Sequence, residues 1–254
     1  MSNYWKNREV RQRKYALDRT IDILNEELKR VYSKSQERII NEMMKLYLEI
    51  MEDNEGKVLV SHLYRYNRYY ELLNKITVEL NKLGSTEKNI FENEFKRLYV
   101  QNQVTIGESF NLSSEINYGA VENAINEIWL NDGLNWSDRI WKDKEKLSQR
   151  LRESLIDSLA TGSGTNNLVK TLIDDFNVSF HNAQTLARTE LAHIQNKSTL
   201  DKFTKEGITK VRILVDKNCC EECTENMGKV FDIATAPQLP IHPNCKCVYM
   251  AVID

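Results

Sequence analysis

The chain has 254 residues, of which 41% are hydrophobic and 28% charged, and its formal net charge is −2 at pH 7. This length and hydrophobic content suit one large or two modest folded domains. The near-neutral charge excludes a strongly basic nucleic-acid coat and an acidic solvating tail, and no apolar run approaches the roughly 18 residues that a membrane helix needs.

The first predicted element is a long helix at about residues 8–52. Hydrophobic residues recur there at alternating steps of four and three, which is the heptad-like pattern of one apolar helix face. The members of this stripe are Leu17, Ile21, Leu24, Leu28 and Val31. The first forty residues also hold ten Lys/Arg against six Asp/Glu, a net +4. A local contact with DNA is therefore one hypothesis for this region, although a solvated helix face explains the charge equally well.

Three further helices are expected before residue 134, at about 58–83, 87–104 and 119–130. Gly84 is predicted to end the first of them, and Ser85 to begin the cap of the second. A turn at Asn131–Gly133 follows the third.

The second half begins with a helix that Ser137 can cap and that Thr161–Gly164 breaks. Two more helices are predicted at about 166–175 and 180–206. The alternating residues at 208–215 predict a strand, and two more strands are expected at 229–233 and 247–253. All three prolines (Pro237, Pro240 and Pro243) lie in this last region. Because proline costs about 3 kcal/mol inside a helix, its absence elsewhere favours a mainly helical body.

Together these patterns predict an α+β protein. A mainly helical N-terminal half, residues 1–134, is followed by a small α+β C-terminal domain, residues 135–254, whose β region contains the cysteine-rich segment that is predicted below to be stapled by zinc.

Four of the five cysteines form one C-terminal pattern, Cys220-x2-Cys223 … His242-x2-Cys245-x-Cys247. Thiolate and imidazole ligands at such spacings converge on one Zn²⁺ when the chain doubles back. A tetrahedral structural site needs four ligands, so we expect the first two cysteines to act with two of the last three candidates. The alternative interpretation is a group of buried thiols beside a short hairpin.

A second polar motif is Arg188-Thr189-Glu190 with His193 and Asn196. On a helix, Glu190, His193 and Asn196 share one side. A Glu–His pair can serve acid–base chemistry. The preferred interpretation is a buried polar network that pins this helix to the sheet.

The last hundred residues resemble the Mu F-like domain of tailed phages, in the phage head morphogenesis or minor head protein family. The motifs that carry the resemblance are Ala187-Arg188-Thr189-Glu190 with Asn196, Gly207, Asp216-x3-Cys220-x2-Cys223, Gly228–Phe231 and His242-Pro243-Asn244-Cys245-Lys246-Cys247. Tyr4-Trp5-x2-Arg8 and Asn135–Trp141 are similar to the Gram-positive (SPP1-type) branch, so the resemblance spans nearly the whole chain. The structural motif residues that it implies are Arg188, Thr189, Glu190, Asn196 and Asp216. Two departures are His193, where many relatives have arginine, and the extra Cys219.

The resemblance implies a minor head protein of the virion without catalytic activity. Its expected partners are the portal protein and capsid or scaffolding proteins, with phage DNA as a weak further partner and no small-molecule substrate. We expect residues 1–134 to contact portal or capsid, and the protein to aid head morphogenesis and DNA packaging or ejection. Its expected location is the head interior, after assembly in the host bacterial cytoplasm.

Three alternatives are weighed against this expectation. The cysteine pattern can imitate a treble-clef nuclease, but the His-His or His-Asn-His arrangement of such an enzyme is not found. An ADP-ribosyltransferase-like enzyme would need Glu-x-Glu on a C-terminal strand, whereas Glu92-x-Glu94 falls on a predicted helix. A module that binds DNA ends would show a steep dependence of affinity on salt.

Overall fold

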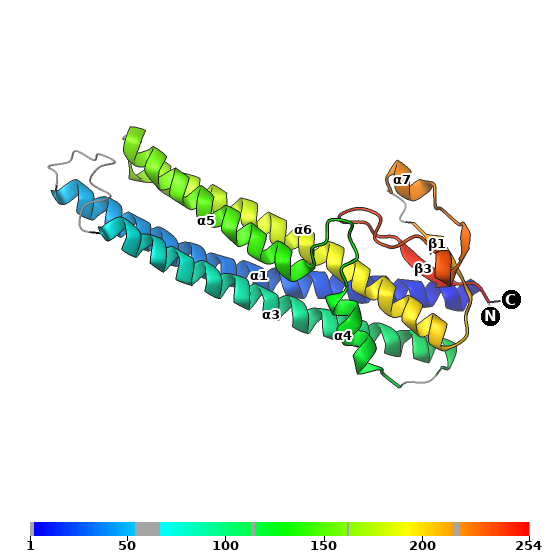
Figure 1. Ribbon diagram of the computed structural model, residues 1–254. Helices are drawn as coiled ribbons and strands as arrows, with labels where there is room; N and C mark the ends of the chain where they lie inside the picture. Colours follow the sequence, from blue (N-terminus) through cyan, green and yellow to red (C-terminus); the bar gives the residue numbers. More distant parts are fainter. Residues whose placement is uncertain (1–2, 54–66, 113–114, 162, 216–218, 254) are drawn as a thin grey trace. The chain divides into compact units, whose positions relative to one another are not determined.

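The computed structural model describes residues 3–53, 67–112, 115–161, 163–215 and 219–253 (Figure 1). The predicted helix segment at 58–66 and the motif residue Asp216 lie outside these described residues. In chain order the elements are α1 (Asn3–Asp53), α3 (Arg68–Phe110), α4 (Tyr118–Asn126), α5 (Trp136–Thr161), α6 (Thr165–Lys205), β1 (Lys210–Leu214), α7 (Glu221–Thr224), β2 (Val230–Asp232), the 3-10 helix η2 (Ile233–Thr235) and β3 (Val248–Ala251). This mainly helical chain with a small C-terminal sheet confirms the predicted α+β class.

The chain divides into two compact units. Unit 1 comprises Met1–Asn25, Phe91–Asn135 and Thr185–Asp254, and unit 2 comprises Glu26–Ile90 and Trp136–Gln184. Each unit therefore draws residues from both sides of position 134. The division into functional regions at 134/135 stays a prediction.

The long N-terminal helix is confirmed by α1, which runs from Asn3 to Asp53. Its predicted apolar stripe is largely inside the protein, because Leu24 and Leu28 are fully buried and Leu17 is buried. Burial of such a stripe supplies most of the stability of a long amphipathic helix.

One helix, α3, replaces the two helices that were expected on either side of Gly84. The prediction of a helix end at Gly84 and a cap at Ser85 is therefore wrong. A Cβ atom added at Gly84 would lie 2.7 Å from Cζ3 of Trp141, closer than real Cβ contacts. The glycine thus allows the indole ring of α5 to approach the backbone of α3, and it does so without leaving the helical conformation.

The separate helices predicted at 166–175 and 180–206 are likewise one helix, α6. The prediction of a break between residues 175 and 180 is therefore wrong. Ser179 is in fact fully buried, and its hydroxyl donates a hydrogen bond to Asp143 of α5. The carboxylate of Asp143 thus satisfies the polar side chain of Ser179, and α6 continues through this position.

The predicted break at Thr161–Gly164 is confirmed, since α5 ends at Thr161 and Gly164 has a positive φ of 77°.

Unit 2 consists, in its described part, of segments of α1, α3, α5 and α6 that run side by side (Figure 1). Their apolar faces form its core. The buried side chains include Ile39, Met43, Ile76, Leu80, Leu147, Leu151, Leu155, Leu172 and Phe176.

A charged cluster lies within this apolar core. Nζ of Lys144 is 2.9 Å from a carboxylate oxygen of Glu87 and 3.1 Å from one of Asp143, and it also contacts the hydroxyl of Tyr32. Glu87 and Lys144 are 1% and 3% exposed. Burial raises the pKa of Glu87, and the nearby ammonium group of Lys144 opposes that rise. The ion pair is what makes two buried charges tolerable at this position.

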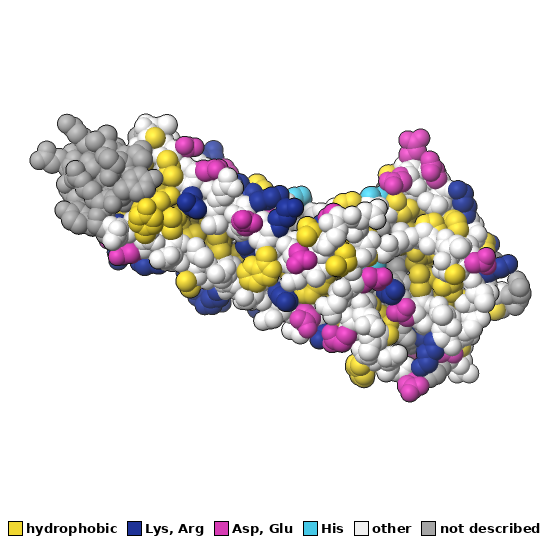
Figure 2. Space-filling model, in the orientation of Figure 1, with side chains coloured by type: hydrophobic (Ala, Val, Ile, Leu, Met, Phe, Trp, Pro, Cys, Tyr) yellow, Lys and Arg dark blue, Asp and Glu magenta, His cyan; other side chains and the backbone are white. Residues whose placement is uncertain are grey.

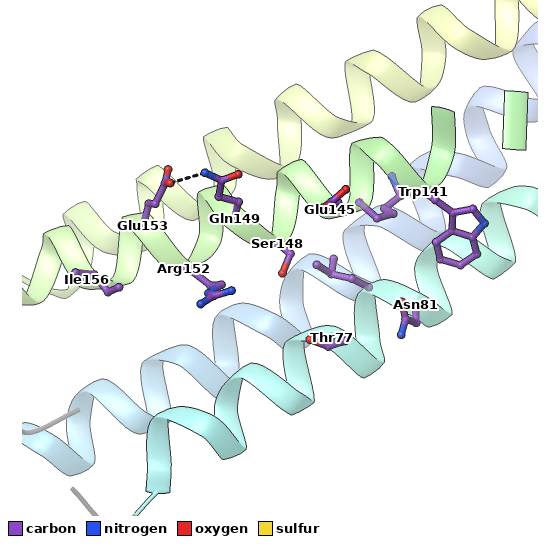
Figure 3. Close-up of a pocket in the computed structure, with 11 residues that line it drawn as sticks. Thr77, Asn81, Trp141, Glu145, Ser148, Gln149, Arg152, Glu153 and Ile156 are labelled. Atoms are coloured by element: carbon purple, nitrogen blue, oxygen red, sulfur yellow. Dashed lines mark hydrogen bonds between the residues drawn. The ribbon is translucent and has the colours of Figure 1, made fainter. Parts of the chain in front are cut away.

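A groove of about 590 Å³ lies between α3 and α5 in unit 2. Figure 3 shows Thr77 and Asn81 on the α3 side, with Trp141, Ser148 and Arg152 on the α5 side. Its lining mixes polar and apolar groups and charges of both signs, so it favours no single class of ligand.

The sheet of unit 1 has the strand order β2-β1-β3, and both neighbouring pairs are antiparallel. The three predicted strands are thereby confirmed. Val211 and Ile213 alternate with more exposed residues along β1 and are fully buried. They pack in one cluster with Phe203 of α6 and Ile106 of α3. The sheet is thus held against helices on its buried face, and its loops carry the cysteine cluster.

Candidate metal centre

The first two candidate ligands are positioned by α7. Cys220 occupies the residue before the helix, and its carbonyl accepts a hydrogen bond from N of Thr224 at 3.0 Å. Residues three apart on such a turn lie on one side. The short helix therefore turns the sulfurs of Cys220 and Cys223 towards the same point.

Two of the other three candidate ligands, His242 and Cys245, are the ends of a tight turn, His242-Pro243-Asn244-Cys245, and Cys247 follows it. N of Cys245 donates to the carbonyl of His242 at 3.1 Å, and Asn244 has a positive φ of 62°. Proline at the second position and a positive φ at the third are features of a type II turn, in which asparagine is tolerated at the third position. The turn brings both of its end residues close to Cys223, whose sulfur lies 3.2 Å from Nε2 of His242 and 3.6 Å from the sulfur of Cys245.

These segments bring the candidate ligand atoms together. Nε2 of His242 lies 3.2 Å from the sulfurs of both Cys220 and Cys223. The sulfurs of Cys223 and Cys245 are 3.6 Å apart. Sulfurs bound at about 2.3 Å to one tetrahedral ion lie about 3.8 Å from each other. The observed spacings are close to those that zinc requires.

All five predicted ligands fall into two overlapping groups. One consists of Cys220, Cys223 and His242, and the other of Cys223, Cys245 and Cys247. Cys223 belongs to both, so the two groups meet at its sulfur. The side chain of Cys219 instead contacts the hydroxyl of Thr224 at 3.2 Å and belongs to neither group.

The tautomer of His242 suits metal binding through Nε2. Its Nδ1 lies 2.9 Å from the carbonyl oxygen of Pro243, and this hydrogen bond raises the pKa of the imidazole. A ring proton held at Nδ1 leaves the lone pair of Nε2 directed at the sulfurs. Metal-ligating histidines commonly have such a partner on the second nitrogen.

The thiols differ in acidity because their hydrogen bonds differ. The thiol of Cys247 donates to Cys245 and lowers the pKa of Cys245 to about 5. The same bond raises the pKa of Cys247. Burial raises the pKa of Cys223 to about 12, whereas the N–H of Cys223 lowers the pKa of Cys220. Zinc binds thiolates, so its binding must displace protons from the thiols that stay protonated without it.

The α6 motif lies directly beside this centre. The hydroxyl of Thr189 accepts a hydrogen bond from N of Asn244, in the ligand turn, at 3.3 Å. Nδ2 of Asn196 donates to the carbonyl of Cys247 at 3.1 Å, and Oδ1 accepts from N of Tyr249 at 3.4 Å. These bonds join α6 to the ligand turn and to the strand β3, so Asn196 makes the contact with the sheet that the polar-network hypothesis predicts.

Glu190 and His193 face a different part of unit 1. A carboxylate oxygen of Glu190 accepts from Nε1 of Trp129 at 2.9 Å, and the ring of His193 stacks on that indole with centroids 4.5 Å apart. Nε2 of His193 lies 3.5 Å from Glu127, and this contact lowers the pKa of Glu127. Neither Trp129 nor Glu127 belongs to a motif that is recognisable in the sequence. They lie in the connector after α4, and no spacing rule relates them to α6.

The remaining motif residue in the described chain, Arg188, is exposed. It shares a surface pocket with Asp18 and Lys246 beside the buried Cys245.

Arg13 is a second arginine with a structural role, and it belongs to no motif that the sequence reveals. The side chain of Arg13 is fully buried, pairs with Glu9, and donates to the carbonyl of Tyr249 at 2.7 Å. It therefore holds α1 to β3, and only its tertiary partners distinguish it from the exposed arginines nearby.

Comparison with known proteins gives one match. Residues 149–250 match the model of the family described as "Phage Mu protein F like protein". The matched range contains all of α6, β1 and β2, β3 except its last residue, Ala251, and all five candidate ligands. Comparisons with curated proteins and with solved structures found no match. In the part of the chain that the structure describes, no helix is both long enough and apolar enough to cross a membrane.

Proposed function

Since residues 149–250 of this chain match the model of the Phage Mu protein F-like family, we propose that the protein is a minor head protein of a tailed bacteriophage or prophage. The family match is the observation that carries the proposal, and at its coarsest it indicates a phage head morphogenesis protein. The finer proposal is association with the portal protein inside the procapsid. Contacts with capsid or scaffolding proteins, assembly in the host cytoplasm and a part in DNA packaging or ejection belong to the same proposal.

The cysteine cluster is proposed to bind one structural Zn²⁺. Cys220 and Cys223 would act with two of His242, Cys245 and Cys247, and the ligand types and their mutual distances support this choice of metal. The ion would cross-link α7 to the ligand turn. Such a staple would stabilise these loops, because the free energy of metal binding adds to the free energy of folding.

A role without catalysis is part of the proposal. Burial of Glu190 and His193, which are each 3% exposed, supports it because the pair that could serve acid–base chemistry has little access to a substrate. Glu190 also already accepts a hydrogen bond from Trp129. Plasmid nicking or NAD consumption that Glu190→Gln abolishes would contradict this part.

The decisive experiment is coexpression with the cognate portal, scaffold and major capsid proteins, followed by gradient sedimentation and blotting for this chain. We expect the chain to migrate with procapsids only when portal is present. A matched pair of variants, Cys220→Ser with Cys223→Ser and the single Cys219→Ser, would show whether incorporation needs the metal centre. A chain that stays at the top of every gradient would contradict the proposal.

A local contact with DNA is kept as a secondary role. It predicts an affinity that falls steeply as the salt concentration rises.

A further inference from the structure

A second surface feature lies next to the metal centre in unit 1. It is an open groove of about 380 Å³ between α7 and the connector that follows α4. Its apolar lining comes from Trp129, Leu130, Pro237, Pro240 and Ile241. The volume is in the range of sites that take a side chain or a small ligand. We call it the α7 groove.

One edge of the α7 groove is acidic. Glu222 and Glu225 line it, and Glu221 lies on the same short helix. All three residues are exposed, and no lysine or arginine of the described residues forms an ion pair with them. Figure 2 shows acidic side chains gathered where Figure 1 places α7. The acidic edge is thus free to pair with cations from outside the chain.

The groove also presents apolar surface to solvent. Leu130 in its lining is 37% exposed, and Met227, which follows the lining residue Asn226, is 56% exposed. Apolar surface next to unpaired charges of one sign is typical of a recognition site with a central anchor and a polar rim.

We propose that the α7 groove binds an extended segment of a partner protein in which an apolar side chain is flanked by lysine or arginine. The apolar side chain would pack against Trp129 and the two prolines, while the flanking cations pair with Glu222 and Glu225. Nucleic acid does not fit this site, because its phosphates would meet the carboxylates. Electrostatic complementarity of this kind selects the partner and steers its approach.

The metal centre would hold the two walls of the groove together. Glu222 lies between the candidate ligands Cys220 and Cys223, and Ile241 immediately precedes the candidate ligand His242. An ion bound by ligands from both segments therefore fixes the spacing between the acidic wall and the apolar wall. The inference rests on the metal centre of the proposed function and does not need its role in the phage head.

The test uses the full-length, zinc-loaded protein and a fluorescein-labelled peptide of about nine residues in which lysine and leucine alternate. Fluorescence anisotropy measures binding, and an otherwise identical peptide with glutamate in place of lysine is the ligand control. We expect the lysine peptide to bind with a dissociation constant of about 1–100 μM and the glutamate peptide not to bind.

Variants separate the two components of recognition. Glu222→Lys with Glu225→Lys should weaken binding about tenfold or more, and Leu130→Ser should weaken it without changing the dependence on salt. Glu108→Lys is the matched control, because Glu108 is exposed on α3 and does not line the groove. Zinc content and circular dichroism establish that each variant is folded. Chelation of the metal should abolish binding.

Three results would overturn the inference. They are the absence of binding by the wild-type protein, equal binding of the two peptides, and equal affinity of the Glu222→Lys/Glu225→Lys variant. Self-association in sedimentation that this double variant abolishes would instead assign the groove to a second copy of the chain. If the lysine peptide fails while the chain still enters procapsids, only this inference falls. If the peptide binds and the chain does not enter procapsids, the proposed role in the phage head is contradicted and this inference is not.

Discussion

The carboxamide of Asn196 is hydrogen-bonded to the backbone of Cys247, with Nδ2 donating to the carbonyl oxygen at 3.1 Å. The same amide accepts from N of Tyr249, and the residue is 1% exposed. Because Cys247 is a candidate metal ligand, one buried side chain joins α6 to the end of the metal-bearing segment. Asn196 therefore contributes both to the stability of the contact between α6 and β3 and to the position of the candidate ligand Cys247.

Replacement of Asn196 by alanine should lower the free energy of unfolding by about 1–3 kcal/mol, because buried backbone groups of β3 lose their partner. Urea unfolding of the zinc-loaded protein measures this loss. Asn93→Ala, on an exposed position of α3, should stay within about 0.5 kcal/mol of wild type. Equal stability of the Asn196 and Asn93 variants would show that the hydrogen bonds to β3 contribute nothing.

Cys223→Ser should reduce bound zinc from about one ion per chain to nearly none and should unfold the ligand loops, since Cys223 belongs to both ligand groups. Elemental analysis and thermal unfolding measure the two effects. Cys219→Ser is the matched control and should retain its metal. Unchanged metal content and melting in the Cys223 variant would mean that the cluster consists of buried thiols only.

Gly84→Ala tests the contact between α3 and Trp141. Alanine gains about 1 kcal/mol of helix propensity, but its Cβ would lie 2.7 Å from the indole ring and force it to shift. We expect a net loss of about 1 kcal/mol in the wild-type background. In a Trp141→Ala background the same substitution should stabilise by about 1 kcal/mol. Absence of this change of sign in thermal unfolding would refute the close-approach explanation.

Lys144→Met should destabilise unit 2 by about 3–5 kcal/mol at neutral pH, because the buried carboxylate of Glu87 loses its cation. Burial already raises the pKa of Glu87, and removal of the ammonium group raises it further. A carboxyl group whose folded pKa is raised favours the folded state more as it becomes protonated, so the deficit should shrink as the pH falls. Adding Glu87→Gln should restore much of the stability in urea unfolding. If the loss of unfolding free energy in the double variant equals the sum of the losses in the two single variants, Lys144 and Glu87 do not stabilise each other.

The contact of His193 with Glu127 predicts the opposite pH dependence. Hydrogen bonding to His193 lowers the pKa of Glu127 below its ordinary value of 4.5. A lowered carboxyl pKa contributes stability above the ordinary value, and this contribution disappears as the pH falls through the folded value. Glu127→Gln should therefore cost less than about 1 kcal/mol near pH 7, because the side chain is 35% exposed, and less still near pH 3. Urea unfolding measures the free energy of unfolding of the variant and of wild type. If the difference between them is the same at both pH values, Glu127 does not have this role.

The sequence by itself determined the fold class, the long N-terminal helix, the three strands and the candidate ligands. These features depend on local rules, because strand alternation, an apolar stripe and the spacing of cysteines are all written in neighbouring residues. The turn of His242-Pro243-Asn244-Cys245 is of the same kind, since proline and a positive-φ asparagine specify it locally.

Only the tertiary structure decided which apparent breaks are real. Helix ends were predicted at Gly84 and between 175 and 180, but at both places the helix continues and meets a partner on α5, the indole ring of Trp141 in one case and the half-buried carboxylate of Asp143 in the other. The burial of Arg13 and the stacking of Trp129 on His193 were hidden for the same reason. Such contacts join residues far apart in the chain, and their energies depend on packing and desolvation that no local pattern encodes.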